Sequence, residues 1–272
     1  MNLASGDGLE VLISRLEGRG LPPLDIYKAR CLQRRVAVRM RACGVGSMAE
    51  YIRVVETDPE EAGRLLATLT VNVTGFFRNP ETWMRLRTLA SDLPGVLEGK
   101  VRAWSAGCAT GEEAWTIAMV LASSIEQRGM TVDGSSLAVD ATDLDRACLH
   151  RAEAGRYLVA DVQANPSVLL GRWTRSDGVE LEVDDALRGC VTFQLHDLGR
   201  DPPPNDRYDL LVCRNVLIYF SREVQVQLLT SFARVLRTGG ILVLGKVETL
   251  PVELRPQFEV LDGRERVFRR LA

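Results

Sequence analysis

A run of small residues followed by two glutamates is the part of the sequence best suited to bind a ligand. Residues 101–115 read VRAWSAGCATGEEAW: an apolar run that can form a buried strand, a turn of small residues, and Glu112 and Glu113 where a helix would begin. Small side chains let the backbone approach a ligand closely, and the N–H groups at a helix start point toward it. Glu113 would accept hydrogen bonds, which suits a ribose or a cationic ligand better than a phosphate. Neither G-x-x-x-x-G-K-[ST] nor a complete G-x-G-x-x-G is present, so this stretch alone indicates a nucleoside-type site only in general terms.

Polar residues also follow two other predicted strands. Strands expected at 136–141 and 208–213 are followed by Asp143 and by Arg214-Asn215. An acid after the second strand of a doubly wound sheet commonly binds ribose hydroxyls, and Asp143 is the candidate for that role. Asp145 is its competitor, and either acid could instead cap the helix that follows.

The elements that position these residues alternate between strand and helix from about residue 100. Helices are expected at 112–128, 146–154 and 222–236. This alternation predicts an α/β fold with a doubly wound, mainly parallel sheet, whose ligand lies at the C-terminal ends of the strands. We also expect a turn at Thr238-Gly-Gly240 before a strand at 241–245.

Two hairpins interrupt or end this pattern. Asp262-Gly263 marks a hairpin between the last two strands. Between the second and third parallel strands, an excursion over about 157–189 contains an alternating stretch with Asp177-Gly178 as its turn, which predicts a small antiparallel hairpin.

The composition bounds the class of protein. Hydrophobic residues make up 46% of the 272 residues and charged residues 26%, with a net charge of −2, an ordinary globular balance that argues against general nucleic-acid binding. Six cysteines without a C-x-x-C pair and only two histidines argue against a structural metal site or a disulfide framework. No apolar run approaches a membrane span and no signal peptide is apparent, so we expect a soluble cytoplasmic protein.

Residues 1 to about 70 predict a helical domain with one basic helix. Asp25–Ala42 places apolar residues at spacings of three and four on one face. The other face carries six cations: Lys28, Arg30, Arg34, Arg35, Arg39 and Arg41. This face could dock an anionic partner, or it could be a solvated surface balanced by Asp58, Glu60 and Glu61; charge alone does not separate the two.

The segment 70–78 connects the two regions and reads TVNVTGFFR. It is poor helix material, yet its side chains can form specific hydrogen bonds, unlike those of a typical Ser-, Gly- and Pro-rich linker. Pro80 then allows a helix over about 81–91.

Four of these stretches together resemble the ordered motifs of the CheR family of chemoreceptor glutamate methyltransferases. The motifs are Asn72-Val-Thr74-x-Phe-Phe-Arg78, the run 104–113, Ala141-Thr-Asp143-Leu-Asp145 and Cys213-Arg-Asn-Val-Leu-Ile-Tyr-Phe220. Four motifs in the right order are far more specific than the glycine turn alone. The resemblance covers about residues 65–270 and implies a Rossmann-like sheet that uses S-adenosylmethionine (SAM) to methylate glutamates on the cytoplasmic helices of chemotaxis receptors.

The resemblance also implies a division of the chain. Residues 1–70 would form a helical substrate-docking domain, 71–90 a linker and cofactor lid, and 91–272 the methyltransferase domain, with a β subdomain at about 157–189. The basic helix then gains a partner of opposite charge, the glutamate-rich receptor helices.

Site residues follow from the motifs by position. The implied cofactor contacts are Asn72, Thr74, Arg78, Gly107, Glu113, Asp143, Asp197, Leu198, Arg214 and Asn215. Asp197-Leu198 falls where the family usually has Asn-Leu near the adenine. Arg78 and Tyr219 fall beside the transferred methyl and are the catalytic candidates, although Tyr219 could also be a core aromatic residue.

The implied chemistry agrees with the scarcity of histidine. A glutamate carboxylate has a pKa of about 4.3 and is already a nucleophile at neutral pH, so its methylation needs alignment and exclusion of water rather than a general base or a metal. A tight bidentate pair would reduce the nucleophilicity of the carboxylate. We therefore expect Arg78 to orient it through partial contact, a role that the Tyr219 hydroxyl could share.

Three departures from the family pattern limit what the resemblance implies. Gly245-Lys-Val-Glu248 stands where the family often has Gly-x-Ser-Glu, Ala114 replaces a usual Pro, and the hairpin around Asp177-Gly178 is shorter than in members that bind a receptor's C-terminal tether peptide. The short hairpin predicts that no receptor-tail pentapeptide is bound.

Two other functions remain open. One is SAM-dependent methylation of another substrate, such as a small molecule or a nucleic acid; the other is a non-catalytic module that binds the cofactor in a signalling assembly. A DNA amino-methyltransferase would need an Asn/Asp-Pro-Pro-aromatic element after 208–213, which is absent, and the net charge does not suit binding to duplex DNA.

Overall fold

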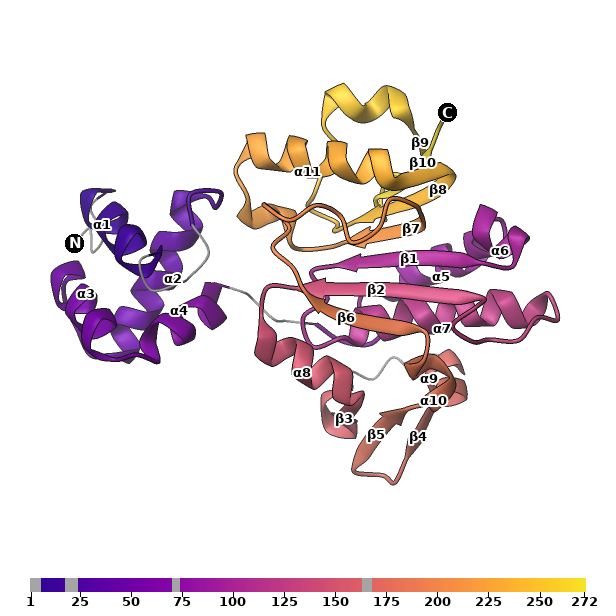
Figure 1. Ribbon diagram of the computed structural model, residues 1–272, viewed down its shortest axis with the longest axis horizontal. Coiled ribbons are helices and arrows are strands. Elements are labelled where there is room, and N and C mark those ends of the chain that lie inside the picture. Colours follow the sequence, from indigo (N-terminus) through magenta and orange to yellow (C-terminus); the bar gives the residue numbers. More distant parts are fainter. Residues whose placement is uncertain (1–5, 18–23, 70–73, 163–167) are drawn as a thin grey trace. The chain divides into compact units, whose positions relative to one another are not determined.

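The chain divides into two compact units. The computed structural model describes residues 6–17, 24–69, 74–162 and 168–272 (Figure 1). The smaller unit comprises Met1–Val71 and Tyr219–Val224, and the larger comprises Asn72–Ile218 and Gln225–Ala272.

The larger unit is built on a seven-stranded sheet in the order β6-β2-β1-β7-β8-β10-β9 (Figure 1). The strands are β1 Val101–Ala106, β2 Leu137–Asp143, β6 Val191–Leu195, β7 Tyr208–Cys213, β8 Leu236–Leu244, β9 Phe258–Asp262 and β10 Val267–Arg270. The first five in the sheet order pair in parallel, whereas β10 is antiparallel to β8 and to β9. The predicted mainly parallel α/β sheet and its final hairpin are confirmed.

Helices cover both faces of this sheet. They are α5 Pro80–Ala90, α6 Pro94–Glu98, α7 Glu112–Gln127, α8 Arg146–Ala154 and α11 Arg222–Val235. Ala103 of β1 belongs to the same core cluster as the apolar residues of α7, while the next residue, Trp104, packs edge-on against Phe232 of α11 at 5.2 Å. Because successive strand residues point to opposite faces, α7 and α11 lie on opposite sides of the sheet.

A small three-stranded sheet is inserted after α8. Its strands are β3 Arg156–Leu158, β4 Thr174–Ser176 and β5 Glu180–Val183, all antiparallel, in the order β3-β5-β4. In the turn between β4 and β5, Asp177 Oδ1 accepts from the backbone N–H groups of Val179 and Glu180, both at 2.8 Å, and Gly178 has a φ of 93°. Short helices η1 Val159–Asp161, α9 Val168–Trp173 and α10 Asp185–Arg188 accompany it. The predicted hairpin is confirmed and gains a third strand.

The turn predicted at 238–240 is wrong, because β8 begins at Leu236 and runs through both glycines. The register shifts there: Tyr208 pairs with Leu236, but Leu210 pairs with Ile241, so the glycines lie in an irregularity of the strand. A Cβ on Gly240 would lie 3.0 Å from the carbonyl oxygen of Asp209. The glycine pair therefore permits close approach of two strands instead of reversing the chain.

Within the described residues, the helices of the smaller unit are α1 Gly6–Glu17, α2 Ala29–Ala42, α3 Met48–Thr57 and α4 Glu61–Leu69. They enclose a core that includes Leu12, Leu32, Val36, Tyr51 and Leu65. Ser47 and Glu50 form a capping box that starts α3, as a serine before an apolar run predicts.

The basic helix α2 starts four residues later than predicted. The backbone before it is engaged with the 219–221 segment: Lys28 N–H donates to the Tyr219 carbonyl at 2.8 Å and Ser221 N–H donates to the Ile26 carbonyl at 3.0 Å. The rings of Tyr27 and Phe220 stack at 5.2 Å. These pairings explain why residues 219–224 group with the N-terminal helices.

Candidate functional site

Most of the predicted cofactor residues follow the C-terminal ends of neighbouring parallel strands. The pairing of Asp143 with Leu195 aligns the end of β2 with that of β6, and the pairing of Ser105 with Val212 aligns β1 with β7. The residues that come next therefore emerge at one edge of the large sheet, where a doubly wound fold binds its ligand.

The small-residue turn between β1 and α7 is held against β2. The backbone N–H groups of Gly107 and Cys108 both donate to the Thr142 carbonyl, at 2.8 and 2.9 Å. Gly107 and Gly111 have φ values of 89° and 94°, in the left-handed region that favours glycine. A Cβ on Gly111 would lie 2.6 Å from the Cβ of Ala152, so the turn has no room for a side chain there.

The two candidate acids after β2 have different roles. Asp145 caps α8, since its side chain accepts from the backbone N–H groups of Ala147 and Cys148. Asp143 accepts from the N–H of Ala109 at 2.8 Å and from that of Asp145 at 3.0 Å, which ties it to the small-residue turn. Burial raises the pKa of the Asp143 carboxyl in spite of these hydrogen bonds.

Glu113, at the start of α7, forms a buried polar contact with Ser105 and Arg214. Its Oε1 accepts from the Ser105 hydroxyl at 3.1 Å, and its Oε2 lies 3.4 Å from Arg214 Nη1. Burial raises the pKa of the Glu113 carboxyl, and the attraction of Arg214 only partly offsets this. The Arg214 side chain is 3% exposed.

Arg214 also reaches the segment that precedes α5. Its Nη2 donates to the Arg78 carbonyl at 3.0 Å and to Asn79 Oδ1 at 2.6 Å, and its guanidinium lies 5.5 Å from the ring centre of Trp83. Trp83 Nε1 donates to the same Arg78 carbonyl at 2.9 Å. Arg214 therefore connects the turn that carries Arg78 to Glu113. Sequence reasoning missed Asn79 and Trp83, whose contacts with Arg214 depend on tertiary packing.

The backbone around Arg78 is constrained by the same contacts. Phe77 and Asn79 have φ values of 51° and 62°, in the left-handed region that non-glycine residues rarely adopt. Phe77 N–H donates to the Thr116 hydroxyl of α7 at 3.2 Å. Such conformations persist where surrounding contacts hold them, and they are common at functional sites.

Glu248 is a further residue of this edge that was not among the predicted sites. It is buried, and its Oε2 accepts from the N–H of Gly245 at 2.6 Å and of Asn215 at 3.1 Å. The departure at 245–248 thus keeps its glycine and glutamate, while the changed residue, Val247, is exposed. Burial raises the pKa of Glu248. Its match to the last position of the Gly-x-Ser-Glu pattern was the signal that could have identified it.

Asp197 and Leu198, predicted near the adenine, follow β6 and are half-buried. Asp197 Oδ1 accepts from Gly199 N–H at 2.9 Å, and its Oδ2 lies 3.5 Å from Arg200 Nε. The preceding residue, His196, donates its N–H to the Asp143 carbonyl at 3.0 Å, which brings this loop beside Asp143.

The remaining predicted site residues lie in or near the two segments that join the units. Thr74 and Arg78 are half-buried in the larger unit, and Asn72 lies outside the described residues. Tyr219 ends the short helix η2 Leu217–Tyr219 and groups with the smaller unit. The two catalytic candidates thus belong to different units.

The strand-end residues have the charge and donor set that the implied cofactor requires. Glu113, Asp143 and Glu248 are three carboxylates whose pKa values are raised by burial, and the buried cation Arg214 pairs with Glu113. Glu248 Oε1 and Arg214 Nε have no hydrogen-bond partner in the described part of the chain. Buried carboxylates are stabilised by a nearby cation. SAM carries a sulfonium, an ammonium and two ribose hydroxyls, so these residues fit it.

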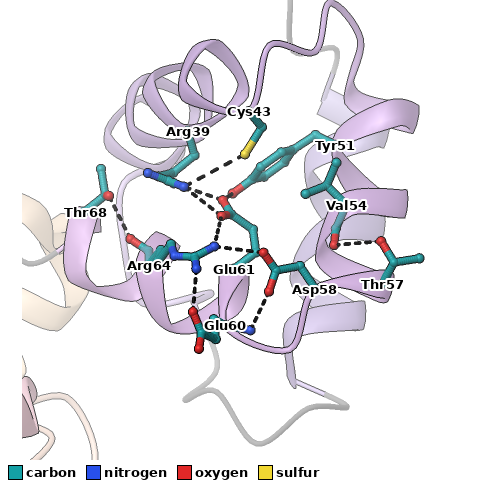
Figure 2. Close-up of polar contacts among 10 residues, drawn as sticks. All are labelled: Arg39, Cys43, Tyr51, Val54, Thr57, Asp58, Glu60, Glu61, Arg64 and Thr68. Atoms are coloured by element: carbon teal, nitrogen blue, oxygen red, sulfur yellow. Dashed lines mark hydrogen bonds and ion pairs between the residues drawn. The ribbon is translucent and has the colours of Figure 1, made fainter.

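Of the six cations predicted to form the docking face, Arg39 is bonded to an internal partner, Glu61 (Figure 2). Arg39 donates to both carboxylate oxygens of Glu61, at 2.9 and 2.7 Å, and the Tyr51 hydroxyl donates to Glu61 Oε1 at 2.8 Å. Asp58 and Glu60 pair with Arg64 of α4. The three acids considered as the balance of the basic face, Asp58, Glu60 and Glu61, are thus paired with Arg39 and Arg64. The other predicted docking residues are exposed or half-exposed: Lys28, Arg30, Arg34, Arg35 and Arg41.

Comparison with known proteins gives matches to both units. A family model described as "CheR methyltransferase, SAM binding domain" matches residues 72–267, and one described as "CheR methyltransferase, all-alpha domain" matches residues 24–70. A protein named "Chemotaxis protein methyltransferase" from Listeria monocytogenes is 32% identical over 84% of this chain and 84% of its own length. Its namesake from Klebsiella aerogenes is 31% identical over 83% of this chain and 77% of its own length.

A third relative is much longer. An uncharacterized 104.1 kDa protein of Rhodobacter capsulatus is 34% identical over 90% of this chain, which spans 26% of that protein.

None of the helices in the described ranges combines the length and apolar character needed to cross a bilayer. The larger unit contains a SAM-binding domain.

Proposed function

Because the chain belongs to the CheR methyltransferase family, we propose that it transfers the methyl group of SAM to glutamate side chains on the cytoplasmic helices of chemoreceptors. The products would be a glutamate methyl ester and S-adenosylhomocysteine, and the role would be adaptation in chemotaxis-type signalling. The observation that carries this proposal is the set of contacts made by Arg214, in which one buried arginine joins Glu113, at the start of α7, to the turn carrying Arg78. The names of the relatives support the assignment to chemotaxis.

In this proposal the strand-end residues hold the cofactor. Asp143 keeps lone pairs for ribose hydroxyls, since the N–H groups of Ala109 and Asp145 occupy only one position on each oxygen. Glu113 would contact the cationic end of the cofactor, with Gly107 allowing close approach of the backbone. Asp197 and Leu198 would lie beside the adenine. The proposed cofactor set is completed by Asn72, Thr74, Arg78, Arg214 and Asn215.

The chemistry requires little acid–base assistance. When bound, SAM supplies an electrophilic methyl group on a positively charged sulfur. The receptor glutamate is ionised at neutral pH, since its pKa is about 4.3, and no protein group has to remove a proton from it. Arg78 would orient this carboxylate by partial contact, and the Tyr219 hydroxyl would donate a second hydrogen bond. The segment 71–90 would serve as a lid that excludes water.

The test is methyl transfer from radiolabelled SAM to a receptor cytoplasmic fragment, with nucleic acid and small acids as alternative acceptors. We expect base-labile label on the receptor fragment, with or without its C-terminal tail, because the short 177–178 hairpin predicts that tail binding is not needed. Label on another acceptor would favour methylation of that substrate. Tight cofactor binding without any transfer would favour a non-catalytic module.

Asp143→Asn is expected to raise the KM for SAM about tenfold or more. Asparagine removes the charge and leaves one acceptor oxygen where the carboxylate offers two, and hydrogen bonds to charged groups contribute roughly 1.5–3 kcal/mol. Asp145→Asn is the matched control, since asparagine caps a helix as well as aspartate does and this residue has no proposed cofactor contact. A similar rise in KM for both variants, or for neither, would argue against the proposed ribose contact.

Arg34→Glu is expected to raise the KM for the receptor fragment at least about fivefold, which corresponds to about 1 kcal/mol. Arg34 is exposed on α2, and a reversed charge there would repel an acidic receptor helix. The effect should shrink as salt is added, because exposed charges are screened. Arg53→Glu makes the same charge change on the exposed face of α3 and should leave this KM unchanged. Equal effects of the two variants would show that only net charge matters.

A further inference from the structure

Tyr157, the central residue of β3, touches both the small-residue turn between β1 and α7, called the cofactor turn below, and the segment that leads to Arg78. We propose that Tyr157 is a positioning residue for methyl transfer: its hydroxyl holds the turn between β1 and α7, and its ring holds residues 76–78. This inference rests on the proposed placement of the cofactor at the strand ends. It assigns the small sheet a role in the reaction that is separate from receptor binding.

The hydroxyl of Tyr157 is bonded to the backbone of the cofactor turn. It donates to the Thr110 carbonyl at 2.7 Å, and Thr110 lies directly before Gly111 and the start of α7. A Cβ on Gly111 would lie 3.1 Å from the Tyr157 hydroxyl oxygen, so the turn packs closely against this side chain. Burial raises the pKa of Tyr157, which keeps its hydroxyl protonated and able to donate at any ordinary pH. Loss of this bond would remove one of two hydrogen bonds that hold the Thr110–Gly111 peptide, the other being from Gly111 N–H to the Cys108 carbonyl at 3.0 Å. This peptide lies two residues from Glu112 and three from Glu113.

The ring of Tyr157 packs against the segment that carries the proposed catalytic arginine. Phe76 meets it edge-on, with ring centres 4.9 Å apart and an angle of 84° between the planes. On the other side, Phe77 N–H is bonded to Thr116 of α7 at 3.2 Å. The Phe76-Phe77 pair is therefore held between β3 and α7, and Arg78 comes next in the chain. The ring contact thus bears on the position of Arg78.

β5 and Arg188 hold the start of β3, the strand that carries Tyr157. Val183 N–H of β5 donates to the Gly155 carbonyl at 2.9 Å. Arg188 donates to the Ala154 carbonyl at 2.7 Å and to the Val183 carbonyl at 3.1 Å, and a Cβ on Gly155 would lie 3.0 Å from its guanidinium. These bonds fix the start of β3 to α8 and to β5. Tyr157 is thus held by the protein itself and can act as a rigid support for the turn.

The first test separates the hydroxyl from general stability. Tyr157→Phe removes only the bond to Thr110 and is expected to raise the Kd for S-adenosylhomocysteine and the KM for SAM about three- to tenfold, the range of one net hydrogen bond. The kcat and the KM for the receptor fragment should stay near the wild-type values. Tyr208→Phe is the matched control, because the Tyr208 hydroxyl is also bonded inside the core, to Asp140 at 2.8 Å, but Tyr208 begins β7 at the opposite edge of the sheet.

Tyr208→Phe should lower the midpoint of thermal unfolding and leave the cofactor Kd unchanged. The inference about the hydroxyl is overturned if Tyr157→Phe binds S-adenosylhomocysteine like the wild type, or if Tyr208→Phe weakens binding to the same extent. Asp143→Asn distinguishes this failure from failure of the proposed cofactor site. If Asp143→Asn also binds normally, the proposed site is wrong; if it binds weakly and Tyr157→Phe binds normally, only the inference is wrong.

The second test addresses the ring. Phe76→Leu keeps an apolar side chain in the core but removes the edge-on ring contact, and it is expected to lower kcat about tenfold while the Kd for S-adenosylhomocysteine stays unchanged. Together the two variants should give opposite patterns, with Tyr157→Phe acting on cofactor affinity and Phe76→Leu acting on kcat. A general loss of stability would not lower cofactor affinity alone in one variant and kcat alone in the other. A normal kcat in folded Phe76→Leu would overturn the role of the ring.

Discussion

Arg214→Met is expected to lower kcat/KM for methyl transfer by a factor of about one hundred to one thousand. The substitution leaves the buried Glu113 carboxylate without its cation and removes the donors to the Arg78 carbonyl and to Asn79. Breaking a buried ion pair by removal of one partner costs about 3–5 kcal/mol, which sets the scale of the loss. Initial rates at a range of SAM and receptor concentrations would measure it.

Arg237→Met is the matched control for this prediction. Arg237 is also shielded, and it pairs with the buried Asp209 at 2.9 Å and with Glu98 near the opposite edge of the sheet. Its loss should destabilise the fold comparably and leave kcat/KM near normal at temperatures where the protein stays folded. Arg214→Lys should fall between wild type and Arg214→Met, because lysine keeps the charge and lacks the planar fork that reaches three acceptors. Equal activity losses in Arg214→Met and Arg237→Met would reduce the role of Arg214 to stability.

Glu61→Gln is expected to destabilise the smaller unit by about 3–5 kcal/mol. Glu61 is 1% exposed and accepts from Arg39 and from Tyr51, so it joins α2, α3 and α4 (Figure 2). Glutamine occupies the same space and removes the charge that pairs with Arg39. Amide hydrogen exchange in α2 and α4 would measure the local loss. Because α2 carries the proposed docking residues, receptor methylation should weaken while the KM for SAM does not change.

The pH dependence of this stability follows from the pKa of Glu61. Burial alone would raise that pKa, but hydrogen bonds from Arg39 and Tyr51 outweigh it and hold the pKa below its ordinary value. Folding therefore favours the ionised form, so the contribution of Glu61 is present above its unfolded-state pKa and is lost as the pH falls through the folded value. In Glu61→Gln, this acid-dependent part of the stability loss should be absent.

Glu60→Gln is the corresponding control. Glu60 also forms an ion pair with an arginine, Arg64, but the Glu60 side chain is 77% exposed. Exposed pairs contribute about 0–1 kcal/mol, so this variant should exchange its amide hydrogens nearly as the wild type does. If Glu61→Gln and Glu60→Gln behaved alike, the buried cluster of Figure 2 would contribute little to holding α2 in place.

The regular elements of the larger unit were largely predictable from local pattern. The strand at 208–213 and the helix at 146–154 have the bounds expected from an unbroken apolar run and from an aspartate cap. The glycine pair at 239–240 misled because the same residues serve in turns and where two backbones approach closely. Which of the two applies depends on the neighbouring strand, here at Asp209.

Contacts between distant segments were not predictable in the same way. Arg39 lies between Val36 and Met40 on α2, beside the apolar face, and only the folded structure brings Glu61 to it from 22 residues away. Tyr157 and Asn79 likewise have no local signal that points to Thr110 or to Arg214. The motifs placed the cofactor residues at strand ends, while the side chains that support them depend on packing between elements.

Peptide mapping of the methylated product tests the central claim most directly. After reaction with SAM, a receptor cytoplasmic fragment would be digested and its methylated side chains identified by mass, before and after mild alkali. We predict alkali-labile methyl groups on glutamate side chains, lost with Arg78→Ala even at SAM concentrations that saturate the variant. Methyl groups on nitrogen that survive alkali, or an unmodified receptor fragment in the presence of tightly bound cofactor, would contradict the account.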